Sequence, residues 1–275
     1  MKRLVVLSSL ILGAGGALAQ DIKVWTRFTG STSDDQGYAV AVDSSGNAIV
    51  AGATQGSIAG GNAGRYDLFV AKYDPSGTRL WVRQRGSDQR EFAYGVATDP
   101  AGNIYTTGYT GGDLDGNTHS GDNTYFDVFV SKFDASGTWG WTRQFGFSNN
   151  DEGRAVATDR FGNIYVTGYV RGALDGLPRP GTADVFIRKY DAAGNKIWSA
   201  LFGSTEVDES FGITCDASGN VFVTGWCSES IDGTPYLGNG DNFLAKYNSS
   251  GQQVWLRQWG TGNKDTGYAV ATDAA

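Results

Sequence analysis

Side chains that could hold a metal ion gather in the short stretch Asp113-Leu-Asp-Gly-Asn117, which His119 and Asp122 follow. Oxygen ligands alternating around a glycine suit a hard cation such as Ca²⁺, which takes about six to eight oxygens in flexible loops. The closing glutamate of a complete calcium loop is absent, and the Leu-Asp-Gly motif returns at Leu174 without flanking ligands. The motif is therefore interpreted as a turn, with a Ca²⁺ site as the alternative. The ligands of that alternative site would be Asp113, Asp115, Asn117 and Asp122.

Two adjacent acid pairs, Asp151-Glu152 and Asp208-Glu209, could act as general acid and base on a glycosidic bond. They fall in long connections that are rich in acid, so a solvated acidic rim or a ligand-binding face is the competing interpretation. His119 is the only histidine, and no G-x-S-x-G motif accompanies it. The sequence therefore favours a non-enzymatic binding, display or scaffold protein, with a glycan-active hydrolase or lyase as the alternative.

A repeat of about 57 residues must position these side chains. The stretch that begins at Gly153, GRAVATDRFGNIYVTGY, has near-copies beginning at Gly37, Gly95 and Gly212. A tryptophan series keeps the same period, with successive separations of 56, 60, 57 and 57 residues. Its members are Trp25, Trp81, Trp141, Trp198 and Trp255.

Each repeat is predicted to contain four antiparallel strands. The first and second strands are joined by D-x-x-G-N and the third and fourth by D-x-x-G, where aspartate bonds the backbone and glycine takes a positive φ. The first strand is rich in Gly and Ala, whereas the third and fourth carry Phe, Tyr and Trp. Small residues suit the crowded centre of a ring and large ones its rim, so the pattern predicts a β-propeller with the first strand innermost.

The segment GVATDPAGNIYTTGY, from Gly95 to Tyr109, resembles the β-propeller repeat of secreted bacterial proteins (SBBP-type repeats) and more loosely the NHL repeat. The resemblance extends from Trp25 to the end of the chain. It implies a propeller in an exported or surface protein, and it carries no catalytic residues.

The predicted fold is all-β, a β-propeller with four complete four-stranded blades and one partial blade. Segments 22–28 and 267–275 would supply an outer and an inner strand of the partial blade, whose two middle strands are missing. We therefore expect a C-terminally truncated chain or a fragment. The complete blades are placed at about 37–86, 95–146, 153–203 and 212–260, within a repeat domain at 20–275.

The first 19 residues are predicted to be a signal peptide, because Lys2 and Arg3 precede an apolar run that ends in small residues. We expect a secreted, extracellular or cell-surface protein, with the periplasm possible, and no later membrane span. Removing those two cations from the net charge of −7 leaves −9, which argues against nucleic acid. The expected partner is a protein or a glycan.

Four of the repeated tryptophans are followed two residues later by arginine, as in Trp81 and Arg83. Residues two apart on a strand share a face. The pairs are therefore interpreted as packing and cation–π contacts between blades. Cys215 and Cys227 lie at distant points on the two arms of one hairpin, so no disulfide is expected between them.

Overall fold

The computed structural model describes residues 25–121, 124–231 and 233–273. The predicted signal peptide at 1–19 and the candidate ligand Asp122 lie outside the described residues.

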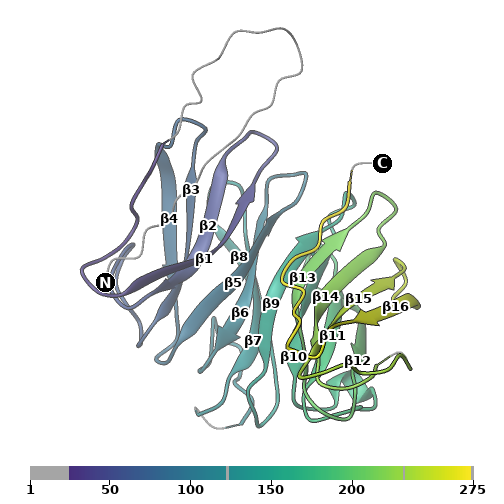
Figure 1. Ribbon diagram of the computed structural model, residues 1–275. Helices are drawn as coiled ribbons and strands as arrows, with labels where there is room; N and C mark the ends of the chain where they lie inside the picture. Colours follow the sequence, from purple (N-terminus) through teal and green to yellow (C-terminus); the bar gives the residue numbers. More distant parts are fainter. Residues whose placement is uncertain (1–24, 122–123, 232, 274–275) are drawn as a thin grey trace, which may run out of the picture.

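The chain forms four antiparallel sheets of four strands each, in sequence order (Figure 1). The first contains β1 (Asp35–Val42), β2 (Ala48–Thr54), β3 (Asp67–Tyr73) and β4 (Arg79–Arg85). The second contains β5 (Glu91–Thr98), β6 (Ile104–Thr110), β7 (Asp127–Phe133) and β8 (Trp139–Phe145). The third contains β9 (Glu152–Thr158), β10 (Ile164–Val170), β11 (Asp184–Tyr190) and β12 (Lys196–Phe202). The fourth contains β13 (Asp208–Cys215), β14 (Val221–Cys227), β15 (Asp241–Tyr247) and β16 (Gln253–Trp259).

The only helical turn in the described part of the chain is the 3-10 helix η1 (Leu174–Gly176). The predicted all-β class and four-stranded antiparallel units are confirmed, and the arrangement is consistent with a β-propeller.

The repeated aspartates build the tight turns, as the sequence predicted. Asp99 Oδ1 accepts hydrogen bonds from the backbone N–H groups of Ala101 and Asn103, both at 2.9 Å. Gly102 in the same turn has a φ of 82°, a conformation that costs glycine little. Asp43, Asp159 and Asp216 make the same contacts, so these residues form turns and are not placed for catalysis.

The first strands of successive sheets, β1, β5, β9 and β13, lie against one another. Residues from neighbouring sheets then fill each junction, as Ile49 and Leu68 of the first sheet do with Ile104 and Phe129 of the second. A Cβ on Gly95 would come within 3.1 Å of the Cα of Ala155 in β9. The small residues of the first strand are thus required by close backbone approach, which supports its predicted innermost place.

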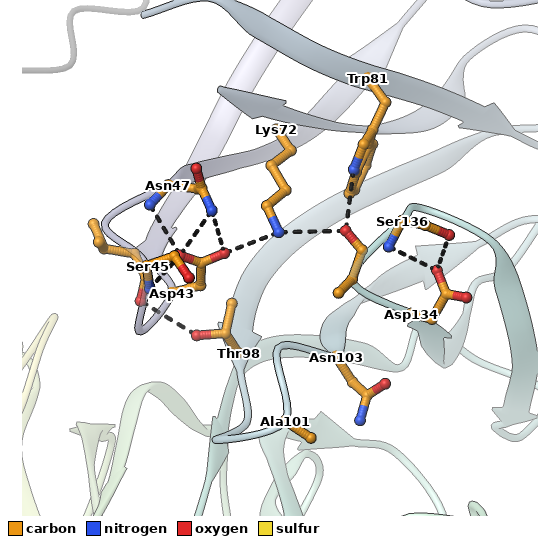
Figure 2. Close-up of polar contacts among 12 residues, drawn as sticks. Asp43, Ser45, Asn47, Lys72, Trp81, Thr98, Ala101, Asn103, Asp134 and Ser136 are labelled. Carbon is orange, nitrogen blue, oxygen red and sulfur yellow. Dashed lines mark hydrogen bonds and ion pairs between the residues drawn. The ribbon is translucent and has the colours of Figure 1, made fainter. Parts of the chain in front are cut away.

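The outer strands are joined to the next sheet by a repeated polar clamp, and Figure 2 shows the lysine and tryptophan of one copy. Lys72 Nζ lies 2.9 Å from Asp43 Oδ2 within its own sheet and donates to the carbonyl oxygen of Ala135 in the next, at 3.3 Å. Trp81 Nε1 donates to the same carbonyl at 3.3 Å. Arg83 adds a bond to the carbonyl of Gly137 at 2.8 Å. Tryptophan and arginine therefore hold the turn of the following sheet, a hydrogen-bonding role that the sequence did not reveal.

The cation–π contact of the tryptophan–arginine pair lies within one strand. The guanidinium carbons of Arg83 and Arg143 are 5.5 and 5.1 Å from the rings of Trp81 and Trp141. Residues two apart on a strand are close enough to stack on each other, so the cation–π contact stays within the strand. The predicted contact between blades is made instead by packing and hydrogen bonds.

Replacing Arg143 with methionine should lower the free energy of unfolding by about 1–3 kcal/mol, because its Nε donates to the carbonyl of Gly194 at 2.9 Å. Arg257 is the matched control, since among the described residues its guanidinium donates only to the neighbouring carbonyl of Leu256. Arg257→Met should change stability by less than about 0.5 kcal/mol. Urea denaturation measures both variants. If both lose the same free energy of unfolding, the hydrogen bond to the next sheet is not the cause of the loss.

The predicted strands at the two ends of the repeat domain are not formed in the described residues 25–28 and 267–273. Trp25 Nε1 nevertheless donates to the carbonyl of Pro75 at 3.1 Å, which repeats the clamp. At the other end, Gly267 N donates to the carbonyl of Gly225 at 3.1 Å, and the segment runs beside β13 (Figure 1). No second or third strand of a further sheet is described beside either segment. Neither segment therefore forms the hydrogen-bonded ladder that defines a strand.

Cys215 and Cys227 are both free. They lie at opposite ends of the β13–β14 pair, where Cys215 pairs with Val221 and Cys227 with Asp208. The offset is the one that the sequence predicted.

Candidate binding site

Each first strand contains a β-bulge close to its start. Along β5, the pairing with β6 passes from Ala93–Gly108 to Gly95–Thr107, which leaves Tyr94 unpaired. Bulges of this kind re-aim a side chain and bend the strand. The same slot is bulged in all four sheets, but the residue in it varies. The bulged residues are Tyr38, Tyr94, Arg154 and Phe211.

These four side chains meet from sheet to sheet in one line, which Tyr268 continues; we call the five residues the bulge line. The ring centroids of Tyr38 and Tyr94 are 4.9 Å apart. The guanidinium carbon of Arg154 lies 4.9 Å from the Tyr94 ring and 5.7 Å from the Phe211 ring. The rings of Phe211 and Tyr268 are 5.5 Å apart. Residues about 57 apart in sequence thus form one continuous aromatic and cationic surface.

Glu152 supplies the counter-charge at the centre of the bulge line. Its Oε2 is 2.9 Å from Arg154 Nη2, and its Oε1 accepts a hydrogen bond from the Tyr169 hydroxyl at 2.8 Å. Burial raises the pKa of Glu152, Arg154 opposes that rise, and the charge of Glu209 adds to it. The Glu152–Arg154 ion pair therefore places one acid and one half-buried cation beside aromatic rings, within the influence of the charge of Glu209.

Burial raises the pKa of Tyr94 from 10 to about 12, and its phenol is a neutral hydroxyl near pH 7. The bulge line accordingly offers ring faces and one guanidinium, and Glu152 and Tyr169 beside it carry hydrogen-bonding groups. Such a surface suits recognition of a ligand with both apolar and polar faces.

In each of the two predicted acid pairs, the aspartate and the glutamate lie in different surroundings. Asp151 and Asp208 are fully buried. The two oxygens of Asp151 accept hydrogen bonds from the backbone N–H groups of Phe147 and Arg171, both at 2.6 Å. Repeat-equivalent acids bond their preceding loops in the same way, namely Asp35, Glu91, Asp208 and Asp265. Asp151 and Asp208 therefore hold loops, whereas the charges of Glu152 and Glu209 act on Arg154.

The residues of the candidate Ca²⁺ site are engaged in the loop. Asp115 is ion-paired with Arg85, and Asp113 Oδ1 accepts a hydrogen bond from the backbone N–H of His119 at 2.7 Å. Asn117 Nδ2 donates to the carbonyl of Leu114 at 2.8 Å. No three His, Cys, Asp or Glu side chains converge on a common point in the ranges that the structure describes. Because Asp122 lies outside those ranges, the Ca²⁺ site stays a prediction.

The shared turn role of the Leu-Asp-Gly motif is confirmed by its backbone. Asp115 and Asp175 have φ values of 54° and 52°, and both pair with an arginine, Asp175 with Arg188 at 2.8 Å.

Sequence reasoning did not find Arg154 or the bulge line. The available signal was the variation at one slot of the repeat, where Tyr38, Tyr94 and Phe211 are aromatic and Arg154 is a cation. The glycine opposite each bulge, such as Gly108, is a second mark, but the bulge itself is fixed only by the pairing of two strands.

Comparison with known proteins identifies the repeat. A family model described as a beta-propeller repeat (SBBP) matches residues 80–115 and 140–169. This chain carries SBBP-type β-propeller repeats. The resemblance proposed from the sequence is thereby confirmed.

Two curated proteins are similar to this chain. The regulatory protein FlaEY of Caulobacter vibrioides is 28% identical over 169 residues, 56% of this chain and 17% of that protein. An uncharacterized WD repeat-containing protein of Acanthamoeba polyphaga mimivirus is 24% identical over 236 residues, 66% of this chain and 16% of that protein. The chain thus spans about one sixth of the length of the curated relatives that it matches.

Solved structures resemble this chain only distantly. A protein of unknown function from Bacteroides caccae has a TM-score of 0.38 at 13% identity, covering 82% of both chains. A mutant of the Synechocystis apocarotenoid oxygenase has a TM-score of 0.44 at 13% identity, covering 82% of this chain and 50% of the other. These values carry no argument about function. A search of the described residues for a helix long and apolar enough to cross a membrane finds none.

Proposed function

We propose that this chain is an exported, non-enzymatic β-propeller module that binds a ligand across the bulge line. The observation that carries the proposal is the contrast between constant and varied positions. Turn aspartates, clamps and loop-holding acids recur in sheet after sheet, whereas the bulged slot holds Tyr38, Tyr94, Arg154 and Phe211 in turn. A rigid scaffold that presents varied side chains along one surface is suited to binding.

In this proposal each sheet is one blade, and residues 25–28 and 267–273 take the places of an outer and an inner strand of a further blade. Two contacts support this. Arg27 Nε donates to the carbonyl of Gly77 at 2.8 Å, as Arg83 does to that of Gly137. Thr272 Oγ1 donates to the carbonyl of Cys215 at 2.9 Å, as Thr158 does to that of Thr98 at 2.8 Å.

Export is proposed because positions 1–19 contain charged residues, then an apolar run, then small residues, in the order typical of a signal peptide. The place of action would be outside the cell, at its surface, or in the periplasm. N-terminal sequencing of the chain recovered from the medium or periplasm of an expressing bacterium tests this, with cleavage after Ala19 as the expected result.

A glycan-active enzyme is the second candidate, because the charge of Glu209 helps to raise the pKa of Glu152 beside Arg154. Release of new reducing ends from a glycan, abolished by Glu152→Gln, would favour it. Binding without turnover would favour the module.

The binding proposal is tested on glycan and peptide arrays with paired variants. Tyr38→Ala and Arg154→Gln should each weaken the strongest interaction about tenfold or more, because both residues lie on the bulge line. Tyr38 is 40% exposed, so its removal leaves the core intact.

Matched controls for this test lie beyond the other end of the first strands. Phe161 is 64% exposed in the turn between β9 and β10, and Arg160 stacks over it at 4.8 Å. Phe161→Ala and Arg160→Gln should leave binding unchanged. Equal losses in the controls and the bulge-line variants would contradict the proposal.

A further inference from the structure

A cavity of about 250 Å³ lies where the loops of the first and second sheets meet. It is smaller than the roughly 300–1,000 Å³ of a site for a drug-sized ligand, so it suits one ring-sized group of a larger ligand. Its lining residues are Arg65, Gln89, Arg90, Gly111, Thr124 and Phe126.

Backbone hydrogen bonds fix the walls of this cavity. Arg65 N donates to the carbonyl of Gln89 at 2.7 Å, and Gly111 N donates to the carbonyl of Arg90 at 2.9 Å. Tyr66 and Arg90 also form an isolated parallel bridge between the loops that precede β3 and β5. These bonds connect three loops, so the backbone that carries Arg65 and Arg90 is held in place.

The cavity is cationic in an acidic chain. Its lining contains two arginines and no carboxylate, whereas the whole chain has a net charge of −7. Both arginines are exposed, and within the described ranges neither guanidinium is ion-paired with an acid. Both arginines line the same cavity, so an anion bound in it would reduce the repulsion between their charges.

The arginine pair is not part of the repeat. The corresponding positions hold Tyr125 and Asn150 at the second junction and Thr182 and Val207 at the third. Neither of those junctions has two cations, so the pair is not needed to join sheets.

Aromatic rings connect the cavity to the bulge line. The Phe126 ring lies 4.3 Å from that of Tyr109, which stacks on Phe92 at 5.1 Å. Phe92 in turn lies 6.3 Å from Tyr94 and 6.0 Å from Tyr38. A ligand on the bulge line can therefore extend one of its groups towards Arg65 and Arg90.

We propose that this cavity binds the carboxylate of an acidic sugar, with Arg65 and Arg90 as the anion-recognising residues. The planar guanidinium fork matches a carboxylate and forms charge-assisted hydrogen bonds. Gln89 supplies an amide group for sugar hydroxyls, and Phe126 supplies an apolar wall. The inference rests on the proposed function in that it takes the chain to be a binding module, and it names the class of ligand.

The test is calorimetric titration of the whole chain, at low salt, with a trimer of galacturonic acid and with its uncharged methyl ester. The acid should bind at least about tenfold more tightly than the ester. Arg65→Gln and Arg90→Gln should each remove about tenfold of the affinity for the acid and leave affinity for the ester unchanged, because both side chains are exposed and the fold does not depend on them. Arg79→Gln, an exposed arginine of β4 outside the cavity, is the control and should bind as the unaltered chain does.

The inference is overturned if the chain does not bind the acid, if acid and ester bind alike, or if Arg79→Gln loses as much as the two cavity variants. A trimer of glutamic acid that binds as tightly as the sugar acid would also overturn it, since the site would then recognise acidic peptides. Tyr38→Ala separates this test from the proposed function. An arginine effect without a tyrosine effect supports the cavity and contradicts the bulge line, and the reverse result contradicts the cavity alone.

Discussion

Gly108→Ala should lower the free energy of unfolding by about 3 kcal/mol or more. Gly108 lies opposite the bulge at Tyr94, and a Cβ there would collide with the carbonyl oxygen of Phe92 and lie 2.8 Å from its carbonyl carbon. Both atoms are backbone, so no side chain can turn aside. Relief would require undoing the bulge, which would also redirect Tyr94.

Gly140→Ala is the control for this substitution in the same sheet. The nearest atom to a Cβ at Gly140 is the carbonyl oxygen of Lys132 at 3.6 Å, an ordinary contact, and the position is exposed. The free energy of unfolding of Gly140→Ala should differ from that of the unaltered chain by no more than about 0.5 kcal/mol. Urea denaturation measures both variants. A loss at Gly108 no larger than that at Gly140 would show that the bulge is not rigid.

The stability of the whole chain should fall as the pH rises from 5 to 8. Burial raises the pKa of Glu91 from 4.5 to about 7 and that of Asp151 from 3.8 to about 7. Between those ordinary values and 7, the folded chain binds more protons than the unfolded chain. Stability from these groups is therefore fully present below about pH 4 and is lost as the pH passes through 7.

Each such group should contribute a slope of up to about −1.4 kcal/mol per pH unit, the value for one proton. Asp151→Asn removes one group and should flatten the dependence between pH 5 and 8. Asp134→Asn is the control, because hydrogen bonds from Ser136 and Thr138 lower the pKa of that exposed carboxyl and place its titration below this range. Denaturation series at several pH values measure the slopes, and a flat profile in the unaltered chain contradicts the prediction.

The fold was largely predictable because its determinants are local and repeated. Asp99 and Gly102 specify a turn by their own backbone preferences, and the spacing of the tryptophans gives the repeat length directly. Close approach between first strands follows from residues such as Gly95. These signals recur in every unit, so they stand out from the variation around them.

The candidate site was less predictable because it depends on register and on contacts between sheets. The bulge at Arg154 exists only in the pairing of β9 with β10, and its contacts with Tyr94 and Phe211 come from two other sheets. The acids chosen from the sequence adjoin this place. Asp151 could not be separated from Glu152 without knowing which carboxyl accepts the loop amides.

Hydrogen–deuterium exchange with and without the tightest ligand from the arrays tests the central claim most directly. If the ligand lies on the bulge line, protection should rise in the segments 36–40, 92–96, 152–156 and 209–213. The turns around Asp99 and Asp159, at the other end of the first strands, should exchange as before. Protection confined to those turns or to the outer strands β4, β8, β12 and β16 would contradict the account.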